Sequence, residues 1–188
     1  SKKTKTITHI NHGGQKSYGY NIFFNDYKDS KDYHSKLPKN VQRDINKSIK
    51  SSYYFKEMNF LNHIPDMKII HKENKDRIHS LKTPGQQGER AYRGGNKFNE
   101  NYIEIFDNIK ISESLLPNRV VSDPNHCTRW FGIFRYLKHY RQGKVITNEQ
   151  LLAYSAIHID GEVSSVGFIW GSPKYHSYGI MFNLITSI

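Results

Sequence analysis

The sequence predicts an α/β (α+β) fold in which helices flank a mostly antiparallel central sheet. Three observations support this class. Asp160-Gly161 separates two β-rich runs, LLAYSAIHI and EVSSVGFIWGS, which is the pattern of a tight hairpin. Val41, Ile45 and Ile49 recur at i, i+4 and i+8, which is the apolar stripe of a helix. The last nine residues, IMFNLITSI, are apolar and predict another helix.

The bulk composition indicates one globular domain. The chain has 188 residues, of which 36% are hydrophobic and 13% aromatic, enough to bury a core. We expect a flexible basic start over residues 1–16 and a single domain over residues 17–188. No apolar run is long enough to cross a membrane, no secretory signal is visible, and Cys127 is the only cysteine. The sequence therefore predicts a cytoplasmic protein.

The positive charge is concentrated in the first half of the chain. The net charge is +11, and residues 1–94 hold 19 Lys and Arg against 9 Asp and Glu. Such asymmetry predicts an anionic partner such as DNA or RNA. A lysine-rich surface that serves solubility alone is an equally good explanation, and the oligomeric state, monomer or dimer, stays open.

Local patterns assign most of the remaining elements in order. Residues 17–27 predict a first strand and residues 26–36 a charged loop, after which Pro38 opens the helix. Residues 53–60 fit either a continuation of that helix or a strand, and residues 65–78 are ambiguous. Residues 83–95, rich in glycine, predict a loop, and residues 102–111 alternate as a strand does.

The segment before the hairpin is predicted to be a helix over residues 128–142. Thr128 is a suitable N-cap and Gly143 a suitable C-terminal glycine. Trp130, Phe134 and Leu137 fall on one side of this helix. The hairpin over residues 151–170 is expected at the centre of the sheet. Its first strand would place Leu151, Ala153, Ile157 and Ile159 on one face and Leu152, Tyr154 and Ala156 on the other.

Common catalytic motifs are absent from the sequence. It contains no P-loop, GxGxxG, GxSxG, HExxH or CxxC pattern, which argues against ordinary NTPases, dinucleotide dehydrogenases, α/β-hydrolases and cysteine-rich or HExxH metal sites. We therefore expect no metal centre. Basic and aromatic side chains instead predict contacts to a nucleic acid or another anionic substrate. The candidates are Arg43, Lys47 and Lys50 on the basic helix and Arg90, Tyr92 and Arg93 in the glycine-rich loop.

The C-terminal segment resembles the central part of the GNAT-like N-acyltransferases. The resemblance rests on the order strand, tight turn, strand, short loop and helix in residues 151–188, and residues 38–95 loosely resemble the FemX-type branch. The family's diphosphate loop, Gln/Arg-x-x-Gly-x-Gly/Ala, corresponds to residues 174–180, which contain one glycine. The family fold continues with another strand and helix beyond the part that residues 151–188 resemble. The resemblance therefore implies an abridged fold or a strand supplied from elsewhere.

The resemblance implies transfer of an acyl group from acetyl-CoA or another acyl-CoA to an amine. His176 or Tyr154 would act as base or acid, although the family's late tyrosine acid has no counterpart. Backbone and side chains of the second strand and the following loop would hold the acyl-CoA: Phe168, Ile169, Trp170, Gly171, Tyr175, Ser177 and Gly179. A non-enzymatic basic protein that binds nucleic acid is the alternative, and a GNAT-like scaffold without catalysis is a third.

Overall fold

The computed structural model describes residues 8–10, 16–18, 26–80, 114–118, 120–142 and 145–188. The chain divides into two compact units, residues 1–38 and residues 39–188, and each is described by itself. The glycine-rich loop at 83–95 and the strand expected at 102–111 lie outside the described residues.

In its described residues, the first unit contains a short antiparallel pair and one helix. Strand β1 (Thr8–Ile10) pairs with β2 (Lys16–Tyr18), which includes the first two residues of the predicted 17–27 strand. The prediction of a charged loop over 26–36 is wrong, because α1 (Ser30–Lys36) forms there. The Asp29 carboxylate accepts from the Asp32 amide at 2.8 Å, and Lys36 pairs with Asp32 at 2.7 Å. These charged side chains cap and brace the helix.

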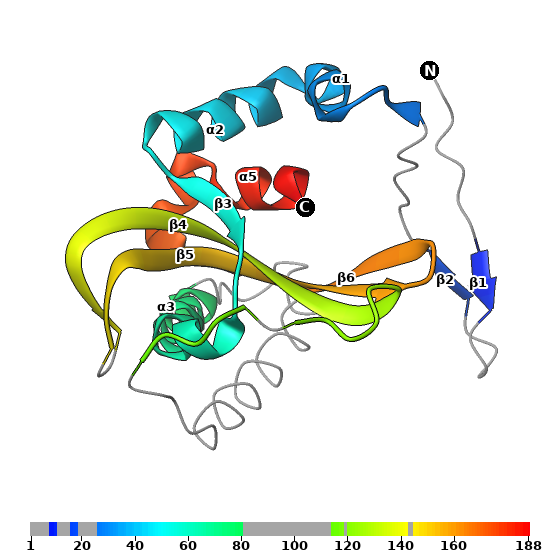
Figure 1. Cartoon of the computed structure of the whole chain (residues 1–188). Helices are drawn as coiled ribbons and strands as arrows, with labels where there is room; N and C mark the ends of the chain where they lie inside the picture. The colour runs from blue at the N-terminus through cyan, green and yellow to red at the C-terminus, as the bar shows by residue number, and fades with distance from the viewer. Residues whose placement is uncertain (1–7, 11–15, 19–25, 81–113, 119, 143–144) are drawn as a thin grey trace. The chain divides into compact units, whose positions relative to one another are not determined.

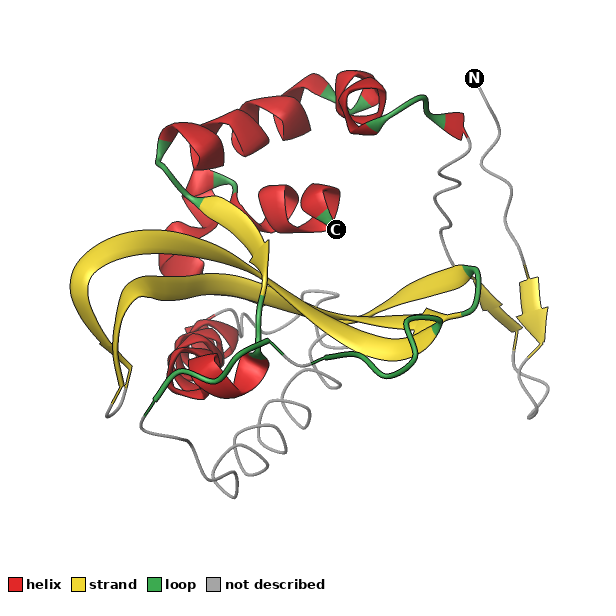
Figure 2. Cartoon of the chain, in the orientation of Figure 1, coloured by secondary structure: helices red, strands yellow, loops and turns green. Residues whose placement is uncertain are grey.

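The second unit is built on a four-stranded antiparallel sheet (Figure 2). Its strands are β3 (Tyr54–Glu57), β4 (His126–Gln142), β5 (Val145–Asp160) and β6 (Val163–Gly171), adjacent in that order. Its helices are α2 (Lys39–Lys50), η2 (Phe60–His63), α3 (Ile64–Ser80), η3 (Pro173–Tyr178) and α5 (Ile180–Ser187). The predicted mixed class and mostly antiparallel sheet are confirmed. The open segments at 53–60 and 65–78 contain a strand and a helix, respectively.

The helix predicted over 128–142 is wrong, because these residues form most of β4. The run is rich in aromatic residues, which fit a strand paired on both sides. Its pairing with β5 extends from His126 opposite Asp160 to Gln142 opposite Val145. Phe55 and Phe131 stack across the β3–β4 pair with ring centroids 5.4 Å apart. Long-range pairing therefore overrides a local pattern that also fits a helix.

Helices cover both faces of the sheet (Figure 1). Helices α2 and α5 pack together on one face, and α3 lies on the other. β5 is an interior strand, whereas β6 is the last strand in the described sheet. The expectation that the whole hairpin forms the centre is therefore correct for β5 only.

A β-bulge divides the core residues of β5 differently from the predicted alternation. Ile133 pairs with Ala153 and Phe134 pairs with Leu151, so Leu152 is the extra residue on β5. One buried cluster, on the α3 side, contains Met58, Ile64, Met67, Ile70, Phe134, Leu151 and Tyr154. The other, on the α5 side, contains Ile133, Leu152, Ala153, Ile180 and Leu184. Leu151 thus shares a face with Tyr154 and not with Ala153.

Helix α2 begins after Pro38 as predicted, but its buried stripe differs from the prediction. Ile45 and Ser48 are buried, whereas Ile49 is 58% exposed. The helix ends in a Schellman motif, in which the Tyr53 amide donates to Ser48 at 3.1 Å and the Ser52 amide to Ile49 at 2.9 Å. Ser52 takes the left-handed conformation with φ of 59°.

The β5–β6 hairpin is confirmed, with its turn one residue later than predicted. Asp160 pairs with Val163, so the two-residue turn is Gly161-Glu162. Gly161 alone of these residues has a positive φ, 61°, which is the type II′ pattern and not type I′. Asp160 stays in the strand because it pairs with His126 of β4, whose Nδ1 lies 2.8 Å from its carboxylate.

A buried carboxylate ties α3 to the β4–β5 pair. Asp66, 2% exposed, accepts from Tyr140 at 2.5 Å, Gln142 at 2.6 Å and the Leu151 amide at 2.8 Å. The Gln142 amide nitrogen also lies 2.9 Å from Nδ1 of His63. Burial raises the pKa of Asp66 to about 6 and lowers the pKa of His63 to about 4.

Substitution at the turn tests its backbone conformation. A Cβ atom at Gly161 would meet no atom within 4 Å, so only the positive φ resists a side chain. Gly161→Val should reduce the free energy of unfolding by about 1 kcal/mol or more, because a β-branched residue disfavours this region. Gly161→Asn should cost much less. Urea denaturation measures both, and equal losses would contradict the assigned strain.

The Asp66 network predicts opposing pH dependences. The native state keeps the Asp66 proton to higher pH than the unfolded chain, so this group lowers stability as pH rises from about 4 to about 6. The unfolded chain protonates His63 at higher pH than the native state, so this group lowers stability as pH falls from about 6.5 to about 4. In the intact protein the two trends offset each other.

Single substitutions should separate the two trends. Asp66→Asn should lose up to roughly 2 kcal/mol more stability than wild type between about pH 6.5 and pH 4.5, because His63 then titrates alone. His63→Gln should instead gain stability relative to wild type over the same pH range, because Asp66 then titrates alone. Urea unfolding at the two pH values measures both. Parallel pH profiles for all three proteins would contradict the two opposing titrations.

Candidate functional site

The predicted acyl-CoA residues lie at the end of β6 and in η3. The Ser172 amide donates to the Leu152 carbonyl at 2.8 Å, so this residue points toward β5. Backbone groups of an antiparallel strand alternate in direction. Gly171 and Ile169 therefore direct their N–H and C=O groups away from β5, toward the outer edge of the sheet. No described strand pairs with that edge.

Side chains from α3 and η3 meet at this edge. Asn74 donates to the Gly171 carbonyl at 2.9 Å and to the Ile70 carbonyl at 2.8 Å. Nε2 of His176 lies 3.1 Å from the same Gly171 carbonyl. The predicted residues Gly171 and His176 are thus brought together. Asn74 was missed by the sequence analysis, because residues 65–78 were left unassigned.

Glu73 of α3 fixes the turn from β6 into η3. Its carboxylate accepts from the Ser172 hydroxyl at 2.5 Å and pairs with Lys174 at 2.6 Å. The hydrogen bond with Glu73 raises the pKa of Lys174. Glu73 therefore binds Ser172 and Lys174, and its negative charge offsets the positive charge of Lys174.

Tyr154 lies inside the protein. It is fully buried, its hydroxyl bonds Nε2 of His71, and the His71 ring lies 4.6 Å from the Trp170 ring. The Trp170 indole N–H is buried and has no partner in the described part of the chain. Of the two predicted acid–base residues, the half-buried His176 lies at the strand edge, whereas Tyr154 is enclosed by aromatic neighbours.

Gly179 has a packing role that the sequence analysis did not anticipate. Its φ is 75°, and an added Cβ would collide with the backbone carbonyl of Asp44 in α2. The glycine thus allows α2 and the start of α5 to approach closely. The close contact leaves no room for a phosphate between Gly179 and Asp44. An anion at this turn would have to bind on the outer side, near Tyr175 and Ser177.

One predicted polyanion contact lies at the same turn. Nζ of Lys47 donates to the Ser177 carbonyl at 3.4 Å. Arg43 lies 3.5 Å from Asp44, and Lys50 is exposed at the end of α2. The structure thus joins the predicted basic helix to the predicted acyl-CoA loop. Arg90, Tyr92 and Arg93 lie outside the described residues, and only the backbone of Phe168 is described.

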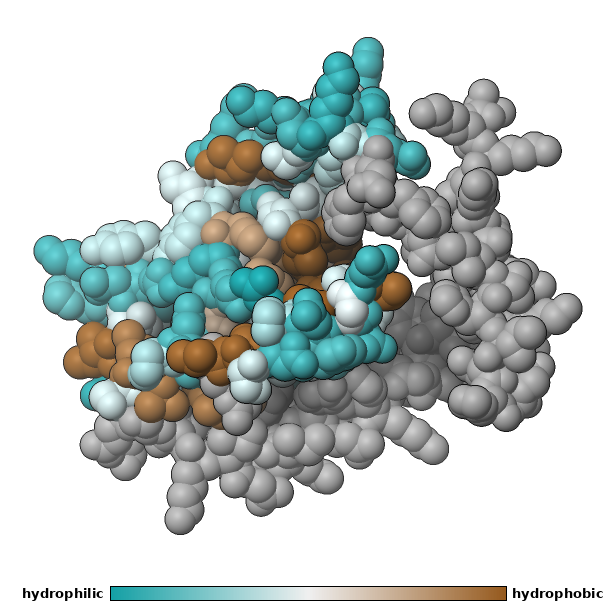
Figure 3. Space-filling model, turned by 45° about the vertical axis from the view of Figure 1, so that its right-hand side comes forward, coloured by the Kyte–Doolittle hydropathy of each residue, from teal (hydrophilic) through white to brown (hydrophobic). Residues whose placement is uncertain are grey.

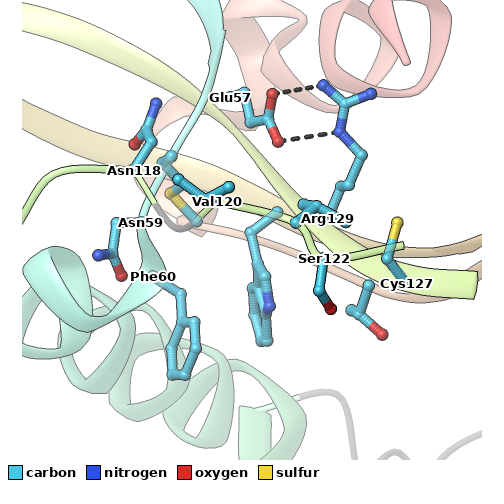
Figure 4. Close-up of a pocket in the computed structure, with 12 residues that line it drawn as sticks. Glu57, Asn59, Phe60, Asn118, Val120, Ser122, Cys127 and Arg129 are labelled. Atoms are coloured by element: carbon cyan, nitrogen blue, oxygen red, sulfur yellow. Dashed lines mark hydrogen bonds and ion pairs between the residues drawn. The ribbon is translucent and has the colours of Figure 1, made fainter. Parts of the chain in front are cut away.

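A separate pocket of about 500 Å³ opens beside β3 and the start of β4 (Figure 4). Arg129 forms two hydrogen bonds to Glu57, at 2.9 and 2.5 Å, which lower the pKa of that carboxylate. Phe60 and Trp130 stack in its wall with centroids 4.6 Å apart. The remaining lining residues are Met58, Asn59, Asn118, Val120, Val121, Ser122, Cys127 and Thr128. The sequence analysis missed this pocket because it placed β4 in a helix.

The described residues contain neither a metal-binding cluster nor a helix suited to cross a membrane. No group of three or more His, Cys, Asp or Glu in this part of the chain is arranged to hold a metal ion. None of its helices combines the length and the apolar character needed to cross a membrane.

Substitution of Gly179 should disrupt packing before it affects any ligand. Gly179→Ala should destabilise the protein by about 2 kcal/mol or more, because it combines a strained φ with a collision against α2. Gly161→Ala is the matched control, since it has a similar φ and open space around its Cβ. Thermal unfolding compares the two. A cost at Gly179 no larger than at Gly161 would show that α2 does not press on this turn.

The chain was compared with family models, curated proteins and solved structures, and none of them matches it.

Proposed function

We propose that the protein transfers an acyl group from an acyl-CoA to an amine at the outer edge of β6. The observation that carries this proposal is the outer edge of β6, with which no described strand pairs. At Ile169 the strand directs its N–H and C=O groups outward, and no described strand pairs with them. Gly171 points the same way but is buried, and Asn74 and His176 already bond its carbonyl. An extended ligand with its own amides can add to such an edge as a further strand would. The pantetheine arm of coenzyme A is such a ligand.

The turn after β6 provides a second feature that suits the proposed substrate. The C-terminal order β5, turn, β6, η3 and α5 matches the order on which the GNAT-like resemblance rests. Lys47 lies beside Ser177 at this turn, and the first amides of α5 follow it. A cation close to a helix N-terminus favours an anion such as a diphosphate.

His176 is the side chain proposed to accept the proton. If Nε2 donates to the Gly171 carbonyl, Nδ1 carries the lone pair that a base needs. The amine nitrogen bonds to the thioester carbon, the carbon–sulfur bond breaks, and the amine proton passes to Nδ1. The thiolate then takes a proton to leave as a thiol. Alignment of the two substrates along a fixed strand supplies much of the rate enhancement in such a reaction.

A matched pair of substitutions tests the strand edge. Ile169→Pro removes an N–H that points away from β5, so the sheet keeps its ladder. Ile169→Ala loses a similar amount of side chain and keeps the N–H. In calorimetric titration with acetyl-CoA, the proline variant should bind about tenfold more weakly than the alanine variant, as expected for one lost hydrogen bond.

The same titration decides the proposal as a whole. Wild-type protein that gives no heat and no thermal shift with about millimolar acetyl-CoA would overturn it. Equal affinities for the two Ile169 variants would show that the strand edge is not part of the binding site. Circular dichroism of both variants provides the control for folding.

A further inference from the structure

A basic and aromatic surface lies along α2 and its C-terminal end. Four cations occur at 39, 43, 47 and 50, close to one side of the helix, and all four are exposed. Successive charges four residues apart lie about 6 Å apart along the axis. Asp44 is the only acid in α2, and it pairs with Arg43. Figure 3 shows mostly hydrophilic side chains, with a hydrophobic patch among them, in the upper part of the view.

A cluster of three tyrosines adjoins this row of cations. The Schellman motif at the end of α2 places Tyr53 against η3. The Tyr53 ring meets Tyr175 at 6.1 Å and Tyr178 at 5.9 Å, both edge to face. The Tyr178 ring contacts the Tyr53 and Tyr175 rings but remains 44% exposed to solvent. The guanidinium of Arg135 lies 5.0 Å from the centre of the Tyr175 ring.

Apart from Arg43, the cations on this surface have no carboxylate partner in the described part of the chain. Lys39, Lys47 and Lys50 form no salt bridge with a carboxylate among residues 26–74, 114–118, 120–142 and 146–188. Lys47 bonds only a backbone carbonyl, and Arg135 bonds the neutral side chain of Gln150. Unpaired cations beside a fixed aromatic ring are the combination that binds a phosphate backbone and stacks a base.

We infer that this surface binds single-stranded nucleic acid. The row of cations on α2 contacts successive phosphates, and a base stacks on Tyr178 beside Lys47. A duplex would offer the same phosphates but no unstacked base, so the tyrosine cluster favours a single strand. The surface does not depend on acyl transfer, and it is tested with no thioester present.

Fluorescence anisotropy with labelled oligonucleotides of about 12 nucleotides tests this inference. A thymidine or uridine single strand should bind more tightly than a duplex of equal length or a polyglutamate of equal charge. Affinity should fall steeply with salt, because neutralised phosphates release counterions. No binding at low salt, or equal binding to polyglutamate, would overturn the inference.

Substitutions separate stacking from charge. Tyr178→Ala should weaken single-strand binding by about 5- to 100-fold, as expected for one lost stack, while Tyr178→Phe should retain it. Lys47→Gln should reduce the salt slope by about 1. Lys72→Gln, an exposed lysine of α3 on the other face of the sheet, is the charge-matched control and should change nothing. If Tyr178→Ala binds as wild type does, or Lys72→Gln is as damaging as Lys47→Gln, the assigned surface is wrong.

Discussion

The buried carboxylate of Asp66 is the constraint on which the arrangement of the second unit depends. It lies in the first turn of α3 and accepts from the Tyr140 and Gln142 side chains and the Leu151 amide. These three donors come from both long strands, so one side chain fixes the helix on the β4–β5 pair. A buried carboxylate is costly unless it is hydrogen-bonded or protonated. Burial raises the pKa of Asp66 although the three donors act in the opposite direction, and burial lowers the pKa of the nearby His63.

Because α3 is fixed at its start, residues two turns later reach the end of β6. His71 bonds Tyr154 inside the core, Glu73 holds Ser172 and Lys174, and Asn74 bonds the Gly171 carbonyl. The strand edge that we propose as the acyl-CoA site is therefore shaped by a helix that precedes it by 97 positions, counted from Asn74 to Gly171. The outward direction of its backbone amides is set by backbone alternation and requires no particular side chain at Ile169. This explains how a site of this kind can exist without a recognisable sequence motif.

The sequence predicted the elements whose signals are local. The β5–β6 hairpin, the start of α2 after Pro38 and the terminal helix each depend on a turn residue, a proline or an apolar run within a few positions. The β4 strand could not be assigned in this way, because residues 128–142 place Trp130, Phe134 and Leu137 on one side of a helix equally well. Its conformation is decided by pairing with β3 and β5, which are distant or later in the chain. The same holds for the candidate site. His176 and Gly171 were predicted from the C-terminal pattern, whereas Asn74, Glu73 and the Glu57–Arg129 pocket depend on contacts across 70 or more positions.

Lys174 lies within η3 and Lys47 lies beside it, and the two lysines have different partners. This difference decides which side of the turn attracts anions. Lys174 faces the Glu73 carboxylate, so its charge is largely cancelled on the α3 side. Lys47 faces the Ser177 carbonyl, which uses one of three ammonium donors and cancels no charge. The positive field is therefore directed toward α2 and the tyrosine cluster. A diphosphate bound at the turn and a nucleic acid bound along α2 would both be drawn to Lys47. Since one ammonium cannot serve two phosphates at full strength, occupancy of either site should weaken the other through this residue.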